Sequence, residues 1–145
     1  KVIFSRFWTE STDGKKTHKF FSGDTLVLVF ELKVIFPSPV KIDLGFSIHS
    51  ILGDTYAVLY SSYQHDEIAS NGAEYVKVSC SLGEMNLSPG MYYIKGRMLA
   101  DREEADWIKD PIGFIDMEMG DFYGTGRGSA KAGNIPMLIK GIWQS

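Results

Sequence analysis

Apolar and polar residues alternate with a period of two over most of this chain. In Tyr75–Leu82 every even-numbered residue is apolar, and in Lys41–Ser50 the apolar Leu44, Phe46 and Ile48 share one face. Because successive side chains of a strand point to opposite faces, this period predicts half-buried β-strands. No window shows a sustained helical period. The expected strands are Val2–Trp8, Thr17–Phe21, Thr25–Phe36, Lys41–Ser50, Thr55–Tyr63, Tyr75–Leu82, Tyr92–Leu99, Gly113–Met119 and Pro136–Trp143.

Turn signals separate these runs at short intervals, among them Asp13-Gly14, Gly23-Asp24, Gly53-Asp54 and Pro89-Gly90. Glycine accepts the left-handed backbone conformation that tight turns require, and proline presets φ. Many short strands with such spacing predict an all-β fold, an antiparallel β-sandwich of the immunoglobulin-like or jelly-roll type. No repeat and no linker interrupts the pattern, so residues 1–145 are expected to form a single domain.

Three connections stand out between the strands. Gln64–Ala73 is expected to be a polar loop, and Asp101–Lys109 a charged connection with room for one helical turn. Asp121–Asn134 is rich in glycine and is expected to be a mobile connection.

The segment Leu87–Tyr92 fixes the orientation of the strand that follows it. A tyrosine two residues after a Pro-Gly turn can bury its ring and return its hydroxyl to nearby backbone, as in the tyrosine corner of immunoglobulin-like sandwiches. If Tyr92 points inward, the alternation places Tyr93, Lys95 and Arg97 on the outward face.

Composition narrows the classes of function. The chain has 145 residues, 44% of them hydrophobic, and a net charge of −3 without a basic run, which argues against a nucleic-acid partner. Its one cysteine, Cys80, cannot form an internal disulfide and reads as a small buried residue. No transmembrane stretch and no signal peptide are evident. The start at Lys1, directly on a strand, is interpreted as a cut from a longer polypeptide, although N-terminal processing would look the same.

Nucleotide and metal sites fit the sequence poorly. Gly128 and Gly133 have the spacing of a phosphate-binding loop, but Asn134-Ile135 follows where that loop needs Lys-Ser or Lys-Thr and a helix. The three histidines lack the spacing of metal ligands. We therefore expect no metal and no cofactor.

The sequence evidence for groups of catalytic residues is also weak. Acidic residues cluster between Asp101 and Asp106, in one charged segment rather than on facing strands, which disfavours a glycosidase pair. No Gly-x-Ser-x-Gly elbow and no nucleophile with an evident base is found, so no catalytic residue is assigned.

A binding surface remains as the best candidate. If Lys41–Ser50 neighbours Tyr92–Leu99, Ser47 and His49 lie beside Tyr93, Lys95 and Arg97. Aromatic rings stack on the apolar faces of sugars, and cations pair with carboxylates or phosphates. The predicted glycan-binding residues are Ser47, His49, Tyr56, Tyr60, Tyr93, Lys95, Arg97 and Trp107, with Tyr56, Tyr60 and Trp107 as stacking platforms. From spacing alone, ordinary outward residues of a solvated sheet explain this set equally well.

The order of these landmarks resembles a known family. Gly23–Leu26 enters a long strand, Gly45–Ile48 precedes the Gly53-Asp54 turn, Leu87–Tyr92 follows an alternating strand, and the chain closes near Trp143. This order is similar to that of the C-terminal carbohydrate-binding domain of the ATP-binding subunit of O-antigen ABC transporters (Wzt type), from about Val2 to Trp143.

The resemblance implies a β-sandwich that follows an ATPase domain in the bacterial cytoplasm, at the inner membrane beside the transporter's transmembrane subunit. It implies a non-catalytic domain that binds the modified non-reducing end of a lipid-linked O-polysaccharide. It also implies a homodimer, in some members with exchanged C-terminal strands. The family supplies no signature for ligand residues, so the predicted set comes from strand phase alone. A structural or adhesive sandwich that binds protein remains open as an alternative, and a glycan-acting enzyme is the least supported.

Overall fold

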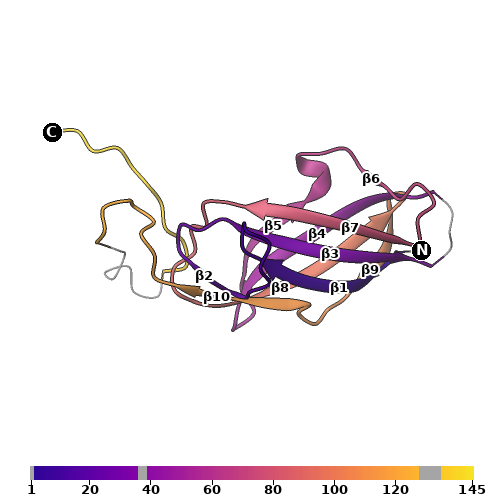
Figure 1. Cartoon of the computed structure of the whole chain (residues 1–145), viewed down its shortest axis with the longest axis horizontal. Coiled ribbons are helices and arrows are strands. Elements are labelled where there is room, and N and C mark those ends of the chain that lie inside the picture. The colour runs from indigo at the N-terminus through magenta and orange to yellow at the C-terminus, as the bar shows by residue number, and fades with distance from the viewer. Residues whose placement is uncertain (1, 36–38, 128–134) are drawn as a thin grey trace.

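The computed structural model describes residues 2–35, 39–127 and 135–145, and its regular secondary structure is almost all strand (Figure 1). A short 3₁₀ helix, η1, follows β5 at Ser61–Tyr63. The strands are β1 (Val2–Glu10), β2 (Lys19–Phe21), β3 (Leu26–Val34), β4 (Lys41–Ser50), β5 (Thr55–Tyr60), β6 (Ile68–Ala69), β7 (Tyr75–Leu82), β8 (Gly90–Ala100), β9 (Glu103–Trp107) and β10 (Gly113–Glu118).

Two sheets form the sandwich. The smaller has the order β1-β3-β7, and the larger has the order β2-β10-β8-β4-β5, with β6 on β4 and β9 on β8. All pairs are antiparallel except β2 and β10, which run parallel. The prediction of an all-β sandwich is confirmed, with this one parallel pair as a departure from a purely antiparallel arrangement.

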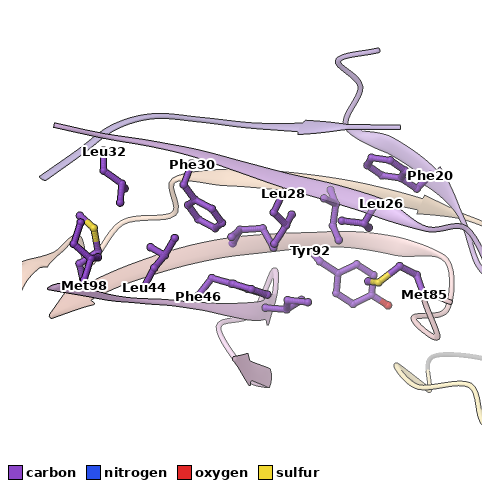
Figure 2. Close-up of a cluster of buried hydrophobic side chains, with 14 of the residues drawn as sticks. Phe20, Leu26, Leu28, Phe30, Leu32, Leu44, Phe46, Met85, Tyr92 and Met98 are labelled. Atoms are coloured by element: carbon purple, nitrogen blue, oxygen red, sulfur yellow. The ribbon is translucent and has the colours of Figure 1, made fainter. Parts of the chain in front are cut away.

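The core lies between the sheets, where the alternating strands present their apolar faces. Leu26, Leu28, Phe30 and Leu32 of β3 are fully buried. They face buried residues of β4 and β8, and Phe30 and Phe46 point toward one another with ring centres 6.1 Å apart (Figure 2). The predicted inward face of Lys41–Ser50 is therefore confirmed.

Tyr92 forms the predicted corner. Its ring is 5% exposed, and its hydroxyl donates a 2.8 Å hydrogen bond to the carbonyl oxygen of Ser88. Burial raises the pKa of the Tyr92 phenol above its ordinary value, an effect that the hydrogen bond with Ser88 partly offsets and the proximity of Tyr56 reinforces. Since Tyr92, Ile94 and Met98 are buried, alternate residues of β8 face outward.

The charged segment Asp101–Lys109 is not a connection with a helical turn; that expectation was wrong. Asp101 and Arg102 adopt positive φ angles of 49° and 68° and reverse the chain, and β9 then pairs with β8. An edge strand tolerates this charge because its side chains remain in water. Two smaller expectations also change, since Ile68–Ala69 of the polar loop pairs with β4 and the strand from Thr55 ends at Tyr60.

The expected final strand, Pro136–Trp143, was also wrong. A single bridge joins Met137 to Leu87, and the Leu138 N–H donates to Asn86. Beyond this point the segment leaves the body of the sandwich (Figure 1). Ile139, Ile142 and Trp143 are 75%, 92% and 96% exposed. The prediction of a mobile Asp121–Asn134 falls partly outside the described residues.

Candidate functional site

An open cavity of about 350 Å³ lies on the outer face of the larger sheet. Antiparallel pairing places Gly45 opposite Arg97 and Ser47 opposite Lys95, so these residues of β4 and β8 form its floor. β5 forms one wall, and the end of β9 with Lys109 forms the other. Its volume is within the usual range for pockets that hold small ligands.

Gly45 shapes the floor. Its strand partner on β5 is Tyr60, and a Cβ atom added at Gly45 would come within 2.4 Å of the Tyr60 ring. Glycine is therefore required for the ring to lie this close to β4. Tyr60 also packs against Tyr63, with ring centres 5.6 Å apart. The aromatic wall thus depends on a missing side chain in the next strand.

Arg97 joins the two walls. Its Nη2 lies 3.0 Å and its Nε 3.1 Å from Oε1 of Glu104 on β9, and its guanidinium lies 5.1 Å from the centre of the Trp107 ring. The hydroxyl of Tyr60 and the carboxylate of Glu104 raise the pKa of Arg97 above its ordinary value. Lys109 lies 5.0 Å from the same indole, so two cations flank the exposed Trp107.

His49 occupies the end of the cavity toward β5. It is 8% exposed, with its Nε2 2.6 Å from the Ser47 hydroxyl and its Nδ1 3.2 Å from the Thr55 hydroxyl. A neutral imidazole has one donor and one acceptor nitrogen, so both contacts can be hydrogen bonds. The arrangement holds the Ser47 hydroxyl at the floor beside Lys95.

The structure brings together most of the predicted binding residues. Ser47, His49, Tyr60, Lys95, Arg97 and Trp107 line the cavity. Tyr93 lies beside them on the same face, paired with His49, but outside the cavity lining.

Tyr56 is the exception, because it packs against the core with its ring 6.0 Å from that of Tyr92. The cause is a shift in register: Ile48 pairs with Ala57 but His49 pairs with Thr55, which leaves Tyr56 as the extra residue of a bulge. Uniform alternation would have placed Tyr56 on the outward face with Tyr60.

Sequence reasoning missed Gly45, Thr55, Val58 and Lys109 as cavity residues. The pairing of β4 with β5 would have indicated Thr55 and Val58, but strand neighbours of this kind are not visible in one sequence. Lys109 escapes prediction because the charges of its segment resemble those of a connection. The Glu104 carboxylate, grouped by sequence with other acids, instead binds Arg97.

Other kinds of site find no support in the part of the chain that the structure describes. Across residues 2–35, 39–127 and 135–145, no three His, Cys, Asp or Glu side chains gather in a way that could hold a metal ion. In those same ranges no helix has the length and apolar character needed to cross a membrane. Gly128 and Gly133 of the possible phosphate loop lie outside them.

Comparisons with known proteins place the fold. No family model and no curated protein sequence matches the chain. A crystal structure of the C-terminal domain of Wzt matches 99% of this chain and 83% of its own, with a TM-score of 0.71 and 12% identity. A DNA-bound alkylpurine DNA glycosylase, AlkC from Pseudomonas fluorescens, matches 81% of this chain but only 30% of its own length, with a TM-score of 0.53 and 12% identity. The chain therefore has the fold of the C-terminal domain of Wzt, as the resemblance in its sequence predicted.

Proposed function

We propose that this chain is a non-catalytic carbohydrate-binding domain of an O-antigen ABC transporter. In this proposal it recognises the modified non-reducing end of a lipid-linked O-polysaccharide and couples completion of the polymer to its export. The observation that carries the proposal is the cavity over β4 and β8, which combines the exposed Trp107 ring and the half-buried Tyr60 ring with cations on a sandwich of the Wzt type.

The chemistry of the cavity suits an acidic sugar. Trp107 and Tyr60 offer ring faces to the C–H faces of a pyranose, and the Ser47 hydroxyl can bond to sugar hydroxyls. Lys95 and Arg97 supply cations at the floor, and charge-assisted bonds from such groups to carboxylate or phosphate are stronger than neutral ones. An acidic terminal group, either a phosphate or a carboxylated sugar, is therefore the expected cap.

Binding without catalysis agrees with the surroundings of Ser47 and His49. These two residues are 2.6 Å apart, but they stand on β4, which is paired with β8 on one side and β5 on the other. The backbone N–H groups beside Ser47 are thus engaged in the sheet and cannot stabilise an oxyanion. The Ser47–His49 pair is better suited to present a hydroxyl to a ligand.

The proposal extends to the partners and the location of the protein. The domain would follow an ATPase domain in the full polypeptide, assemble with the transmembrane subunit of the transporter and work in the cytoplasm at the inner membrane. Its polymer partner would be a glycan rather than a nucleic acid.

A homodimer with exchanged C-terminal segments is part of the same proposal. Met137 and Leu138 are anchored by backbone contacts to Leu87 and Asn86, and the apolar Ile139, Ile142 and Trp143 beyond them are exposed. Exposed apolar side chains at this density favour burial against another surface. A second copy of the sandwich, whose β5 and β7 are edge strands, offers such a surface.

The test is a calorimetric titration of the chain with cap-bearing O-polysaccharide purified from the producing cell. We expect saturable binding, and weaker binding for Arg97→Ala at unchanged thermal stability. Absence of binding by a folded wild-type chain would instead favour the alternative, a structural or adhesive sandwich whose exposed face contacts protein.

A further inference from the structure

A second cavity, of about 290 Å³, lies at an edge of the sandwich, where β1 of the smaller sheet meets β10 of the larger sheet. Its lining includes Trp8 of β1, Lys16 and His18 of the following turn region, and Phe114 of β10. None of these residues belongs to the cavity over β4 and β8.

An aromatic row connects the two cavities across the outer face of the larger sheet. His49 of β4 pairs with Tyr93 of β8, and Tyr93 pairs with Phe114 of β10. Directly paired residues share one face of a sheet, so the three side chains start from neighbouring positions on the outer face. The ring of His18 then lies 4.8 Å from that of Phe114, and both line the second cavity.

Beyond His49, which is only 8% exposed, the row is available to a ligand. Phe114 is 40% exposed, His18 is exposed and Tyr93 is partly exposed. Strands lie about 4.8 Å apart, so the step from β5 through β4 and β8 to β10 covers roughly 15 Å. On β10, Asp116 and Glu118 follow Phe114 on the same face and bound the row on one side with negative charge.

Past the edge where β1 meets β10, the row adjoins a cluster of cations around Trp8 on the outer face of the smaller sheet. Arg6, Lys16 and Lys77 lie 4.9, 4.6 and 5.4 Å from the centre of the Trp8 ring. None of the three forms an ion pair in the described part of the chain. Glu10 accepts a 2.6 Å hydrogen bond from the Trp8 indole, and Glu31 stands opposite Arg6 on β3. These two carboxylates offset part of the charge of the three cations, and the remaining positive charge favours an anionic ligand.

We propose that the polymer bound at the first cavity continues along His49, Tyr93, Phe114 and His18 and places an acidic group at Trp8 and Lys16. This inference rests on the proposed function, because its ligand is the same glycan. The site then contacts an extended segment of the polysaccharide rather than its end group alone. Rings beneath the middle of the segment contact sugar faces, and cations at both ends contact charged groups.

The three tryptophans allow a direct test, because each reports on a different place. Trp107 lines the first cavity, Trp8 lines the second, and Trp143 is 96% exposed on the C-terminal segment. The indole N–H signals of the ¹⁵N-labelled chain, assigned by single Trp→Phe variants, are followed with two probes. One probe is the purified cap-bearing polysaccharide, and the other is a short cap-bearing fragment obtained from it by partial hydrolysis.

We expect the polymer to shift the signals of Trp107 and Trp8, and the fragment to shift that of Trp107 alone. Phe114→Ala should weaken binding of the polymer roughly threefold to tenfold and leave the fragment unaffected. Tyr123→Ala, which removes an equally exposed ring outside the row, is the matched control.

The outcomes separate this inference from the proposed function. If the polymer shifts Trp107 alone and Phe114→Ala binds it like wild type, the extended row is wrong and the first cavity stands. If neither probe shifts Trp107, the proposed function itself is wrong, and the row, which begins at that cavity, is rejected with it.

Discussion

The ring of Tyr60 lies against the backbone of Gly45, so closely that a Cβ atom at Gly45 would come within 2.4 Å of the ring. This contact sets the shape of the candidate binding cavity, because Tyr60 forms one wall and Gly45 part of the floor. The wall therefore depends on a position that carries no side chain.

Gly45→Ala should displace Tyr60 and weaken glycan binding by up to about tenfold, since the aromatic platform moves away from its place. The fold should survive, because the ring can swing outward into water. Calorimetric titration measures the affinity, and thermal unfolding checks the fold. Gly141→Ala is the matched control, as nothing lies within 4 Å of a Cβ there. Unchanged affinity in Gly45→Ala would remove Tyr60 from the site.

Arg97→Ala should weaken binding of an acidic glycan by at least about tenfold, because a charge-assisted contact is lost. Arg97→Lys should recover only part of the affinity, since lysine keeps the charge but lacks the planar fork. The affinity of wild type should also fall as salt rises, and less so in Arg97→Ala. Lys41→Ala, an exposed cation on the same sheet outside the cavity, should bind normally. Equal affinities for wild type and Arg97→Ala would show that Arg97 makes no contact with the ligand.

Tyr92→Phe should lower the free energy of unfolding by about 1–3 kcal/mol, because the buried carbonyl of Ser88 loses its donor. Chemical denaturation at neutral pH measures the loss. Tyr75→Phe, at a ring that is 50% exposed, should change little.

The same tyrosine predicts a pH dependence. The pKa of Tyr92 is raised in the folded chain, so the folded state holds its proton at a pH where the unfolded state has lost it. The contribution to stability is complete below the ordinary phenol pKa of about 10 and is lost as pH rises through the raised value. Wild type should therefore lose stability above about pH 10 more steeply than Tyr92→Phe. Parallel curves for the two proteins would contradict this.

Removal of residues 139–145 should convert the proposed dimer to a monomer. The segment carries Ile139, Ile142 and Trp143, which are exposed in one copy and would be buried against a second. Light scattering of the full and shortened chains gives the two masses. The same number of copies per particle for both chains would rule out a role of this segment in association.

Strand positions could be predicted from alternation where one face is buried and the other is wet. Lys41–Ser50 and Tyr75–Leu82 match β4 and β7 residue for residue. The corner at Tyr92 was also predictable, since a Pro-Gly turn followed by tyrosine leaves few alternatives. This corner fixed the phase of β8 and hence the outward position of Lys95 and Arg97.

The failures have local physical causes. The charges of β9 conceal a strand that pairs only at an edge, and the apolar Pro136–Trp143 looks like a strand but has only a single bridge, to Leu87, in the described chain. A bulge opposite Ile48 and His49 turns Tyr56 inward, and no local signal marks it. The cavity walls depend on which strands neighbour β4 and β8, and pairing between distant segments is not encoded in any one segment.

The central claim is that the cavity over β4 and β8 recognises the modified end of an O-polysaccharide. Its most direct test is one titration of the chain with the same polysaccharide before and after chemical removal of its terminal cap. The account predicts saturable binding of the capped polymer and a loss of at least about tenfold in affinity, about 1.4 kcal/mol, on removal of the cap. Equal binding of the two polymers, or binding of neither by the folded chain, would contradict it.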